Sequence, residues 1–330
     1  MLPPAMFNSG TGTTAILNSA SNTAAAIFET KKDLGQGVVA GPLPAWAHDE
    51  EFIREAGRFY DDELREAKYA FLILYDCGAL GQPHPAQPDT TCQDAAYDTI
   101  RLANMSLWIA NPSPLSIRFV VHVAGGRGSG ASRVTILDPV TAHPRNESNI
   151  LTVHDINQAK CLFTNLSGVP RTSALRTSAK FLWKTLTEVG WWEVRYVTTW
   201  IALEALFGPE SPGETTFKIC QRIAFFLSDK ESERLPTYQK AHELYEPRCK
   251  LVHGRLLKNL YGERSLDVSF EAEEMLRLSL RKILLDTDLT RKFSSETERE
   301  KYLTNLVFSG SEATPHPDPL PPAEGEGKGK

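Results

Sequence analysis

The sequence predicts a predominantly helical protein in which an α+β domain is followed by an all-α, antiparallel helical bundle. Two features of the apolar pattern indicate this order. Between residues 116 and 137 the apolar residues are mainly Val, Ile and Phe in short runs, which is typical of strands. From about residue 172 onward, apolar residues recur at helical intervals with short breaks, which favours antiparallel helices.

The first half divides into a segment without regular structure and a small α+β domain. We expect residues 1–47 to be loosely ordered, because residues 8–26 are mostly Ser, Thr, Asn, Gly and Ala and offer few large apolar groups. The α+β domain is expected over residues 48–168. Its predicted elements are a helix from Asp49 with apolar positions as far as Phe71, a helix from Ala95 to Ala110, and strands over 116–123 and 133–137.

A cluster of glycines lies between the two predicted strands, from Gly125 to Gly130. A phosphate-binding loop needs a helix N-terminus behind it, and here the next segment has the pattern of a strand. The cluster therefore indicates the tip of a hairpin rather than a nucleotide site.

The second half, residues 169–308, is expected to form the helical bundle. Pro209 cannot continue a helix and Gly208 suits the position just past a helix end, so this pair marks one boundary. The tail, residues 309–330, is rich in Pro and Gly and is expected to be extended and disordered. The helices predicted from the apolar spacing cover residues 173–188, 191–207, 215–228, 234–253, 268–286 and 296–306.

The composition argues against several classes of protein. The net charge is −5, so no overall basic field favours nucleic acid, and any RNA contact needs a local basic patch. The densest apolar stretch, Ala70–Tyr75, is far short of the ~20 residues that cross a bilayer. The five cysteines are scattered without a C-x-x-C pair, and the first basic residue is Lys31. We therefore expect a cytoplasmic protein without disulfides and without membrane contact.

Four potential metal ligands share one face of the predicted helix 234–253, because they are spaced by four, three and four residues. They are His242, Glu246, Cys249 and His253. Thiolate and imidazole are natural zinc ligands, but two or three ligands from one helix leave a zinc site incomplete. The segment also has a structural interpretation, as the apolar stripe of a helix that ends at the capping residue Gly254. We expect no metal and no cofactor.

Three segments of the helical half form an ordered set of motifs. They are Trp200-Ile201-Ala202-Leu203-Glu204-Ala205-Leu206-Phe207-Gly208, then Lys218-Ile219-x-x-Arg222-Ile223-Ala224, and then Leu244-Tyr245-x-x-Arg248-x-Lys250-Leu251-Val252-His253-Gly254. Together they resemble the HEPN superfamily, the higher-eukaryote and prokaryote nucleotide-binding domains. Within it the set is most similar to the ApeA-like group of bacterial defence proteins. The resemblance covers about residues 170–308 and leaves the first half unassigned.

This resemblance implies an all-α bundle that works as a dimer. Many members of the superfamily are metal-independent endoribonucleases that serve as toxins or antiviral effectors, and the resemblance implies such an activity for this chain. Carried onto this chain, it makes Arg248 and His253 the catalytic candidates. Many active members have Asn, Asp or His directly after the arginine, whereas this chain has Cys249.

Two functions follow as hypotheses. The first is an RNA-cleaving enzyme of bacterial defence or toxin action, with an N-terminal domain that senses or recruits. The second is a catalytically silent module that dimerises and binds a nucleotide or a protein. Cys249 and the acidic net charge favour the second, and the intact pair of Arg248 and His253 favours the first.

Other polar residues of the motifs have two interpretations each. Glu204 lies among apolar residues, so it is either paired with a basic residue beside the core or it orients Arg248 or His253. Basic residues of the same half either carry solvated charge or contact RNA phosphates. The candidates for such contacts are Lys218, Arg222 and Lys250.

An arginine and a histidine suffice for metal-free RNA cleavage, because the 2′-hydroxyl of RNA itself attacks the adjacent phosphorus. A histidine can move the proton and an arginine can hold two phosphate oxygens. On a regular helix, however, Arg248 and His253 point ~140° apart. Either a second copy of the chain completes the site or the helix loosens before Gly254. Trp191 and Trp192 suit the core or the interface that a second copy would need.

Overall fold

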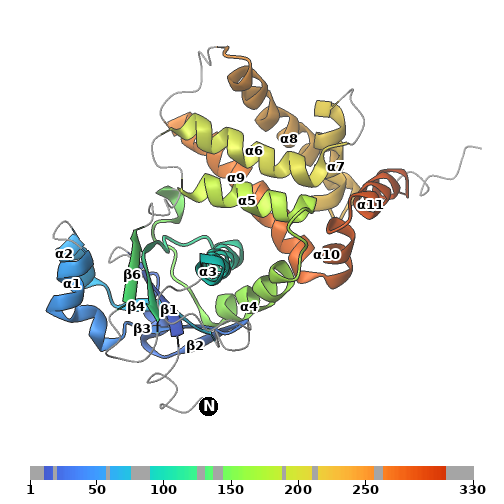
Figure 1. Ribbon diagram of the computed structural model, residues 1–330. Coiled ribbons are helices and arrows are strands. Elements are labelled where there is room, and N and C mark those ends of the chain that lie inside the picture. The colour runs from blue at the N-terminus through green and yellow to red at the C-terminus, as the bar shows by residue number, and fades with distance from the viewer. Residues whose placement is uncertain are drawn as a thin grey trace, which may run out of the picture.

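An antiparallel sheet and a layered set of helices make up the described part of the chain (Figure 1). In Figure 1, α3 lies between the sheet and the helices of the second half. The predicted order, an α+β part and then helices, is confirmed. The computed structural model describes residues 11–17, 21–56, 60–75, 90–124, 131–136, 144–187, 191–209, 215–255 and 263–309.

The sheet has six strands in the described residues, in the order β2-β3-β4-β1-β5-β6, and every neighbouring pair is antiparallel. The last two, β5 and β6, correspond to the two predicted strands. The glycine cluster between them lies outside the described residues. The strands are β1 (Thr11–Leu17), β2 (Lys32–Gly35), β3 (Val38–Pro42), β4 (Tyr69–Tyr75), β5 (Ile117–Ala124) and β6 (Ala131–Ile136).

The prediction that residues 1–47 are loosely ordered is wrong for β1, β2 and β3. Strand β1 lies inside the sheet, where Thr14 is opposite Leu72 of β4 and Val121 of β5. Small residues and threonines indicated disorder because they bury little apolar surface by themselves. A strand paired on both sides is instead held by backbone hydrogen bonds to two neighbours, and its apolar cover comes from elements elsewhere in the chain.

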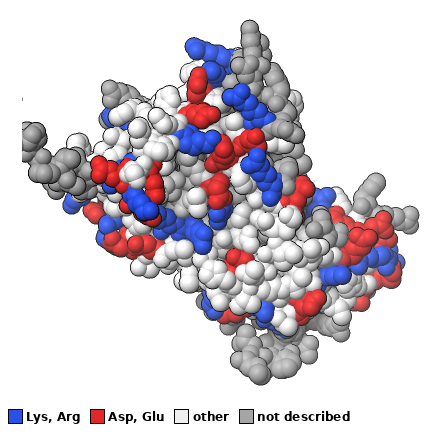
Figure 2. All heavy atoms as spheres, turned by 180° about the vertical axis from the view of Figure 1, so that it is seen from behind, with Lys and Arg blue, Asp and Glu red and all other residues white. Residues whose placement is uncertain are grey.

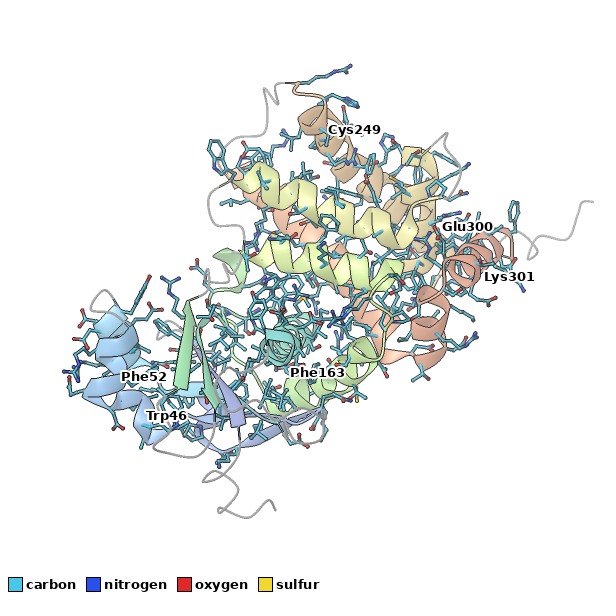
Figure 3. The ribbon with its side chains drawn as sticks, in the orientation of Figure 1. Trp46, Phe52, Phe163, Cys249, Glu300 and Lys301 are labelled. Carbon is cyan, nitrogen blue, oxygen red and sulfur yellow. The ribbon has the colours of Figure 1, made fainter. Side chains whose placement is uncertain are left out.

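Helices cover both faces of the sheet, and successive side chains of β1 alternate between them. Ile16 faces a small cluster with Phe119, Phe52 and Leu64. Its neighbour Leu17 belongs to the main core. The small cluster is closed by the short helices α1 (Glu50–Ala56) and α2 (Asp61–Glu66), and Trp46 packs edge-on against Phe52 beside it (Figure 3).

The predicted helix from Asp49 to Phe71 is therefore only partly correct. It gives way to β4 at Tyr69, and Phe71 lies in that strand. The alternation in β4 explains the change, because Tyr69, Phe71 and Ile73 face the main core, whereas Ala70 and Leu72 do not. The second predicted helix is present as α3 (Thr90–Ala110).

The second half is helical as predicted, with one further helix, α10, and the first half ends with α4, a helix that the apolar spacing did not predict. Helix α4 begins with a capping box in which Thr152 and Asp155 bond each other's backbone N–H groups. The helices are α4 (Val153–Ser167), α5 (Ala174–Thr187), α6 (Trp192–Phe207), α7 (Thr215–Leu227), α8 (Glu231–Val252), α9 (Glu263–Leu285), α10 (Thr287–Phe293) and α11 (Glu296–Ser309). The tail after α11 lies outside the described residues.

One apolar core runs through both halves of the chain. It includes Phe28 and Ile109 of the first half, Phe163 of α4, and Leu206 and Leu284 of the second half. Figure 3 shows Phe163 on α4 close to α3. The predicted domain boundary at residue 168/169 is therefore not a gap in the packing, because α4 packs on both α3 and α9.

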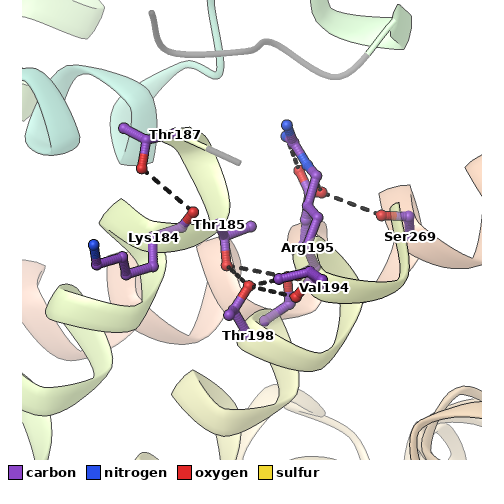
Figure 4. A network of polar contacts seen from close by, with 9 residues as sticks. Lys184, Thr185, Thr187, Val194, Arg195, Thr198 and Ser269 are labelled. Atoms are coloured by element: carbon purple, nitrogen blue, oxygen red, sulfur yellow. Dashed lines mark hydrogen bonds and ion pairs between the residues drawn. The ribbon is translucent and has the colours of Figure 1, made fainter. Parts of the chain in front are cut away.

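A polar network fixes α6 against α9 (Figure 4). Arg195 donates from Nε to Glu273 at 2.6 Å and from Nη2 to the other carboxylate oxygen at 2.8 Å. Ser269 donates to the same carboxylate at 3.3 Å. Both partners of this ion pair are buried, so neither charge is left without compensation. This network joins one side of α6 to α9, and α8 packs against another side of α6.

The position of β1 leads to a stability prediction. Ile16 is fully buried, so Ile16→Ala is expected to lower the free energy of unfolding by about 2–5 kcal/mol through lost burial and a cavity. Ile150→Ala is the matched control, because the same side chain is 52% exposed there, and its expected effect is within ~0.5 kcal/mol. Urea unfolding of both variants is the measurement. Equal effects would contradict the placement of β1 in the sheet.

Candidate functional site

The C-terminal end of α8 is closed by a glycine cap. Gly254 has a φ of +64°, which glycine adopts without strain. The N–H of Arg255 donates to the carbonyl of Lys250 at 2.8 Å, and the N–H of Gly254 donates to Leu251 at 3.0 Å. These two bonds form the Schellman arrangement that ends many helices. The capping role predicted for Gly254 is confirmed, and His253 is the last residue before it.

Glu204 joins α6 to α8 where the two helices meet. Its Oε2 accepts from Nη2 of Arg248 at 2.8 Å, and its Oε1 accepts from the Tyr245 hydroxyl at 2.7 Å. Trp200, one turn earlier on α6, meets the Tyr245 ring edge-on, with the ring centroids 4.9 Å apart. The interpretation that Glu204 is paired with a basic residue beside the core is confirmed, and that residue is Arg248.

Tyr245 is a buried and fixed hydrogen-bond donor. Burial raises the pKa of its hydroxyl, and the hydrogen bond to Glu204 raises this pKa further. The hydroxyl therefore keeps its proton at neutral pH. The Arg248 guanidinium lies 5.5 Å from the centroid of the Tyr245 ring, a cation–π contact. Tyr245 thus holds Glu204 and Arg248 at the same time.

The Arg248 guanidinium is only partly used by these contacts. Its side chain is 18% exposed, although its Nε is itself buried and has no hydrogen-bond partner among the described residues. A guanidinium carries five N–H donors in a planar fork that matches two phosphate oxygens. Glu204 and Tyr245 therefore orient Arg248 while leaving it donors for an anionic oxygen.

His253 lies in the exposed last turn of α8. Its backbone N–H still donates to the carbonyl of Cys249 at 3.2 Å, so the helical bonding continues to this residue. Helix α8 itself ends at Val252, and His253 is its C-cap with φ −90° and ψ 12°, so regular helical geometry ends at the residue before Gly254. Among the described residues, no hydrogen bond or ion pair joins the His253 imidazole to Arg248 or Glu204.

Cys249 packs against the main core and does not extend the site. Its free thiol is half-buried beside the core, and Figure 3 shows the residue near the C-terminal end of α8. Another core thiol, Cys220 of α7, has its pKa raised to about 12 by burial. Glu246 pairs with Lys250 at 2.7 Å. Within the described residues, no group of three His, Cys, Asp or Glu side chains is arranged to hold a metal ion.

The prediction that Arg222 contacts RNA is wrong. Arg222 is 7% exposed, forms an ion pair with Glu300 of α11 and donates to the carbonyl of Phe207 at 3.2 Å. Figure 3 shows Glu300 on α11, away from the C-terminal end of α8 that carries Cys249. Arg222 therefore ties α7 to α11, and a phosphate in solution would have to break a buried ion pair to reach it.

The other two basic candidates remain partly accessible. Lys218 is half-buried on α7, and the Lys250 side chain is 43% exposed although it pairs with Glu246. Figure 2 shows basic and acidic side chains intermixed over the upper part of the face that it presents. An extended basic track is therefore not visible on that face, and phosphate recognition would have to be local.

The two tryptophans before α6 have different surroundings. Trp191 is 69% exposed, whereas Trp192 is half-buried and lies 6.1 Å from the ring of Tyr196. Val194 on the next turn is also 44% exposed. Trp192 is thus an anchor of the core, and Trp191 with Val194 forms an exposed apolar patch at the start of α6.

Sequence analysis overlooked Tyr245 as a site residue. It was assigned only to the apolar stripe of its helix, and its ring does pack there. The overlooked signal is its hydroxyl, because a buried tyrosine usually has a hydrogen-bond partner. Its spacing of three residues from Arg248 places both side chains on one side of α8.

Comparisons of this chain with protein-family models, curated proteins and solved structures give no match. The resemblance to the HEPN superfamily therefore rests on the motif residues themselves. None of the helices in the described ranges combines the length and the apolar character needed to span a membrane.

The buried bond between Tyr245 and Glu204 generates a prediction. Tyr245→Phe removes a donor to a carboxylate and is expected to cost about 1.5–3 kcal/mol of unfolding free energy. Because the folded-state pKa of Tyr245 is raised, its contribution is complete below about pH 10 and is lost as the pH rises further. Denaturant unfolding from pH 7 to 11 should show a shallower alkaline loss of stability in the variant.

The control for this prediction is Tyr238→Phe. It removes one hydroxyl from a half-buried tyrosine of the same helix without touching Glu204. Its expected effect is within ~0.5 kcal/mol. Equal stability losses in the two variants would show that the bond to Glu204 contributes nothing.

Proposed function

We propose that this chain is a metal-independent endoribonuclease of the HEPN type, in which Arg248 and His253 act on the RNA phosphate. The observation that supports this most is the partly buried bridge from Tyr245 through Glu204 to Arg248. It restrains a guanidinium that is 18% exposed, five residues before an exposed histidine at a capped helix end. Such restraint is what electrostatic stabilisation of a transition state requires.

RNA, an arginine and histidine side chains supply every group that takes part in the reaction. The 2′-oxygen forms a bond to the adjacent phosphorus, and the bond from phosphorus to the 5′-oxygen breaks. A histidine accepts the proton of the 2′-hydroxyl, and a protonated histidine gives one to the leaving 5′-oxygen. The products are a 2′,3′-cyclic phosphate and a 5′-hydroxyl. Arg248 stabilises the negative charge that grows on the phosphoryl oxygens.

The complete site in this proposal is built by two copies of the chain. On a regular helix Arg248 and His253 would point ~140° apart, and no hydrogen bond or ion pair joins the two side chains within the described residues. A two-fold axis beside α8 would supply a second His253 to each Arg248. The exposed apolar patch of Trp191 and Val194, and the 50% exposed Val252, are suited to the contact between copies.

The biological setting belongs to the same proposal. The resemblance to the ApeA-like group favours bacterial defence or toxin action in the cytoplasm. The sheet and its helices would then form the part that senses or recruits. The continuous core between the two halves supports direct coupling, because a change near α3 or α4 reaches α9 through packed side chains.

A second candidate function is a silent module that binds a nucleotide. A surface hollow between α7 and α8 favours it, because its walls combine hydroxyl groups with aromatic faces. The rings of Phe217 and Tyr238 lie 5.8 Å apart there, and Tyr238 lies 6.0 Å from His242. Thr215 and Thr216 add the hydroxyls. A nucleobase has apolar faces, which can stack on the aromatic rings, and polar edges, which can bond the hydroxyl groups.

A nuclease assay distinguishes these candidates. Wild type is expected to cut mixed RNA in the presence of EDTA, to leave single-stranded DNA intact and to produce 2′,3′-cyclic phosphate ends. Arg248→Ala and His253→Ala should each lower kcat by about 10²–10⁴-fold. Arg248→Ala should lower kcat more than it raises KM, because the charge that it compensates develops in the transition state.

Matched controls are Arg65→Ala and His154→Ala. Arg65 also pairs with a carboxylate, and His154 is also exposed, but both lie in other parts of the fold. Neither should change the rate. The ribonuclease proposal fails if DNA is cut equally, if EDTA stops cleavage or if both site variants stay fully active. If the wild-type protein cuts no RNA, the result favours the second candidate, the silent nucleotide-binding module.

The two-copy site predicts self-association of the full chain. The isolated helical half is unsuitable for this test, because its core is shared with the first half. Light scattering at micromolar concentration should give a dimer, and Trp191→Ser should raise the dissociation constant about tenfold or more. Phe308→Ser, which changes a side chain of similar exposure on α11, should leave association unchanged. A monomeric wild type would contradict the shared site.

A further inference from the structure

Three arginines surround a single aspartate where the two halves of the chain meet. Asp98 of α3 accepts from Nη2 of Arg101, 2.5 Å away on the next turn, and from Nη2 of Arg176 of α5. Arg171, in the connection between α4 and α5, places its Nη2 3.7 Å from the same carboxylate. Arg176 also donates to the carbonyl of Leu166 at 3.2 Å, at the end of α4.

The charges of this arginine cluster do not balance. Three guanidinium groups against one carboxylate leave a surplus of two positive charges. Asp94 and Lys180, one turn away on α3 and α5, are exposed, and the charges that act on Arg176 are those of Asp98, Arg101 and Arg171. At two other sites of the fold, arginines do not outnumber carboxylates in this way. Arg195 forms an ion pair with Glu273, and Arg65 forms ion pairs with both Glu50 and Asp61.

Burial makes this surplus costly. The side chains of Arg176 and Arg101 are only 11% and 23% exposed. Burial lowers the pKa of Arg176, and the positive charges of Arg101 and Arg171 lower it further. The Nε of Arg101 and the hydroxyl of Ser167 are buried without hydrogen-bond partners in the described part of the chain. Unpaired buried donors and uncompensated charge both favour an additional anion.

We propose that the cluster of Arg101, Arg171 and Arg176 is a binding site for a phosphate group. A phosphate carries up to two negative charges, which matches the surplus, and its oxygens match the planar fork of arginine. Arg171 is 79% exposed and can close over a ligand from the solvent side. The phosphate belongs either to a small phosphorylated molecule or to a nucleic-acid backbone.

The position of the site gives the binding a consequence. Arg101 lies on α3, which packs between the sheet and α5, whereas Arg171 and Arg176 lie at the start of the second half (Figure 1). A bound phosphate would replace repulsion among the arginines by attraction, and so would tie α3 to α5. A phosphorylated ligand would thereby stabilise the junction of the two halves. This inference is independent of the ribonuclease proposal and uses none of its residues.

Calorimetric titration of the full chain tests the site with two probes. Pyrophosphate represents a small phosphorylated ligand, and a short oligothymidine represents a backbone that lacks the 2′-hydroxyl. Arg171→Gln and Arg101→Gln should each weaken binding about tenfold, as expected for the loss of a charge-assisted hydrogen bond. Binding of pyrophosphate alone assigns a small ligand, and binding of the oligonucleotide assigns a backbone.

Two further variants separate recognition from folding. Asp98→Asn removes the negative charge of the cluster and should tighten binding about tenfold, an effect that a purely structural aspartate would not produce. Arg65→Gln removes an exposed, ion-paired arginine of α2 and should leave the affinity unchanged. The proposal is overturned if wild type binds neither probe at millimolar concentration, if the Arg171 and Arg101 variants bind as wild type does, or if Asp98→Asn binds more weakly while keeping its Tm.

Discussion

The carboxylate of Glu204 is the group on which the candidate site depends. Glu204 lies on α6 among apolar residues, so its carboxylate needs hydrogen-bond partners from a neighbouring helix. It finds two on α8, the Tyr245 hydroxyl and the Arg248 guanidinium, and these contacts set how α8 meets α6. The ion pair of Arg195 with Glu273 holds α6 to α9 independently. Together the two pairs restrain the element that carries Arg248.

The arginines of this fold have three kinds of surroundings, which differ in burial and in the number of nearby carboxylates. Arg195 and Arg222 are buried with one carboxylate each and join helices. Arg248 has one carboxylate but keeps part of its surface exposed, which suits a site that must also accept an anion. The arginines around Asp98 outnumber their carboxylate. Burial and charge balance therefore show which arginines are fully used in joining helices, which position in a motif does not show.

The first half shows where reasoning from composition fails. Strand β1 is rich in Thr, Gly and Ala and was assigned to a disordered segment, yet it lies between two apolar strands. Helix α4 was also overlooked, although Thr152 and Asp155 carry the signal of a capping box. The long predicted helix after Asp49 failed because β4 is apolar at every position, and only its packing shows the alternation of a strand. For β1 and β4 the deciding information lies in the neighbouring strands, whereas for α4 it lies in its own capping residues.

The sequence by itself determined the helices of the second half except α10, the cap at Gly254 and the candidacy of Arg248 and His253. These features are local, because helical periodicity and capping depend on residues a few positions apart. Only the tertiary structure decided that Arg222 pairs with Glu300, that Tyr245 shares Glu204 with Arg248, and that three arginines meet at Asp98. Apart from the pair of Asp98 and Arg101, these contacts join residues that are tens of positions apart, so only the packing of the helices determines which charges meet.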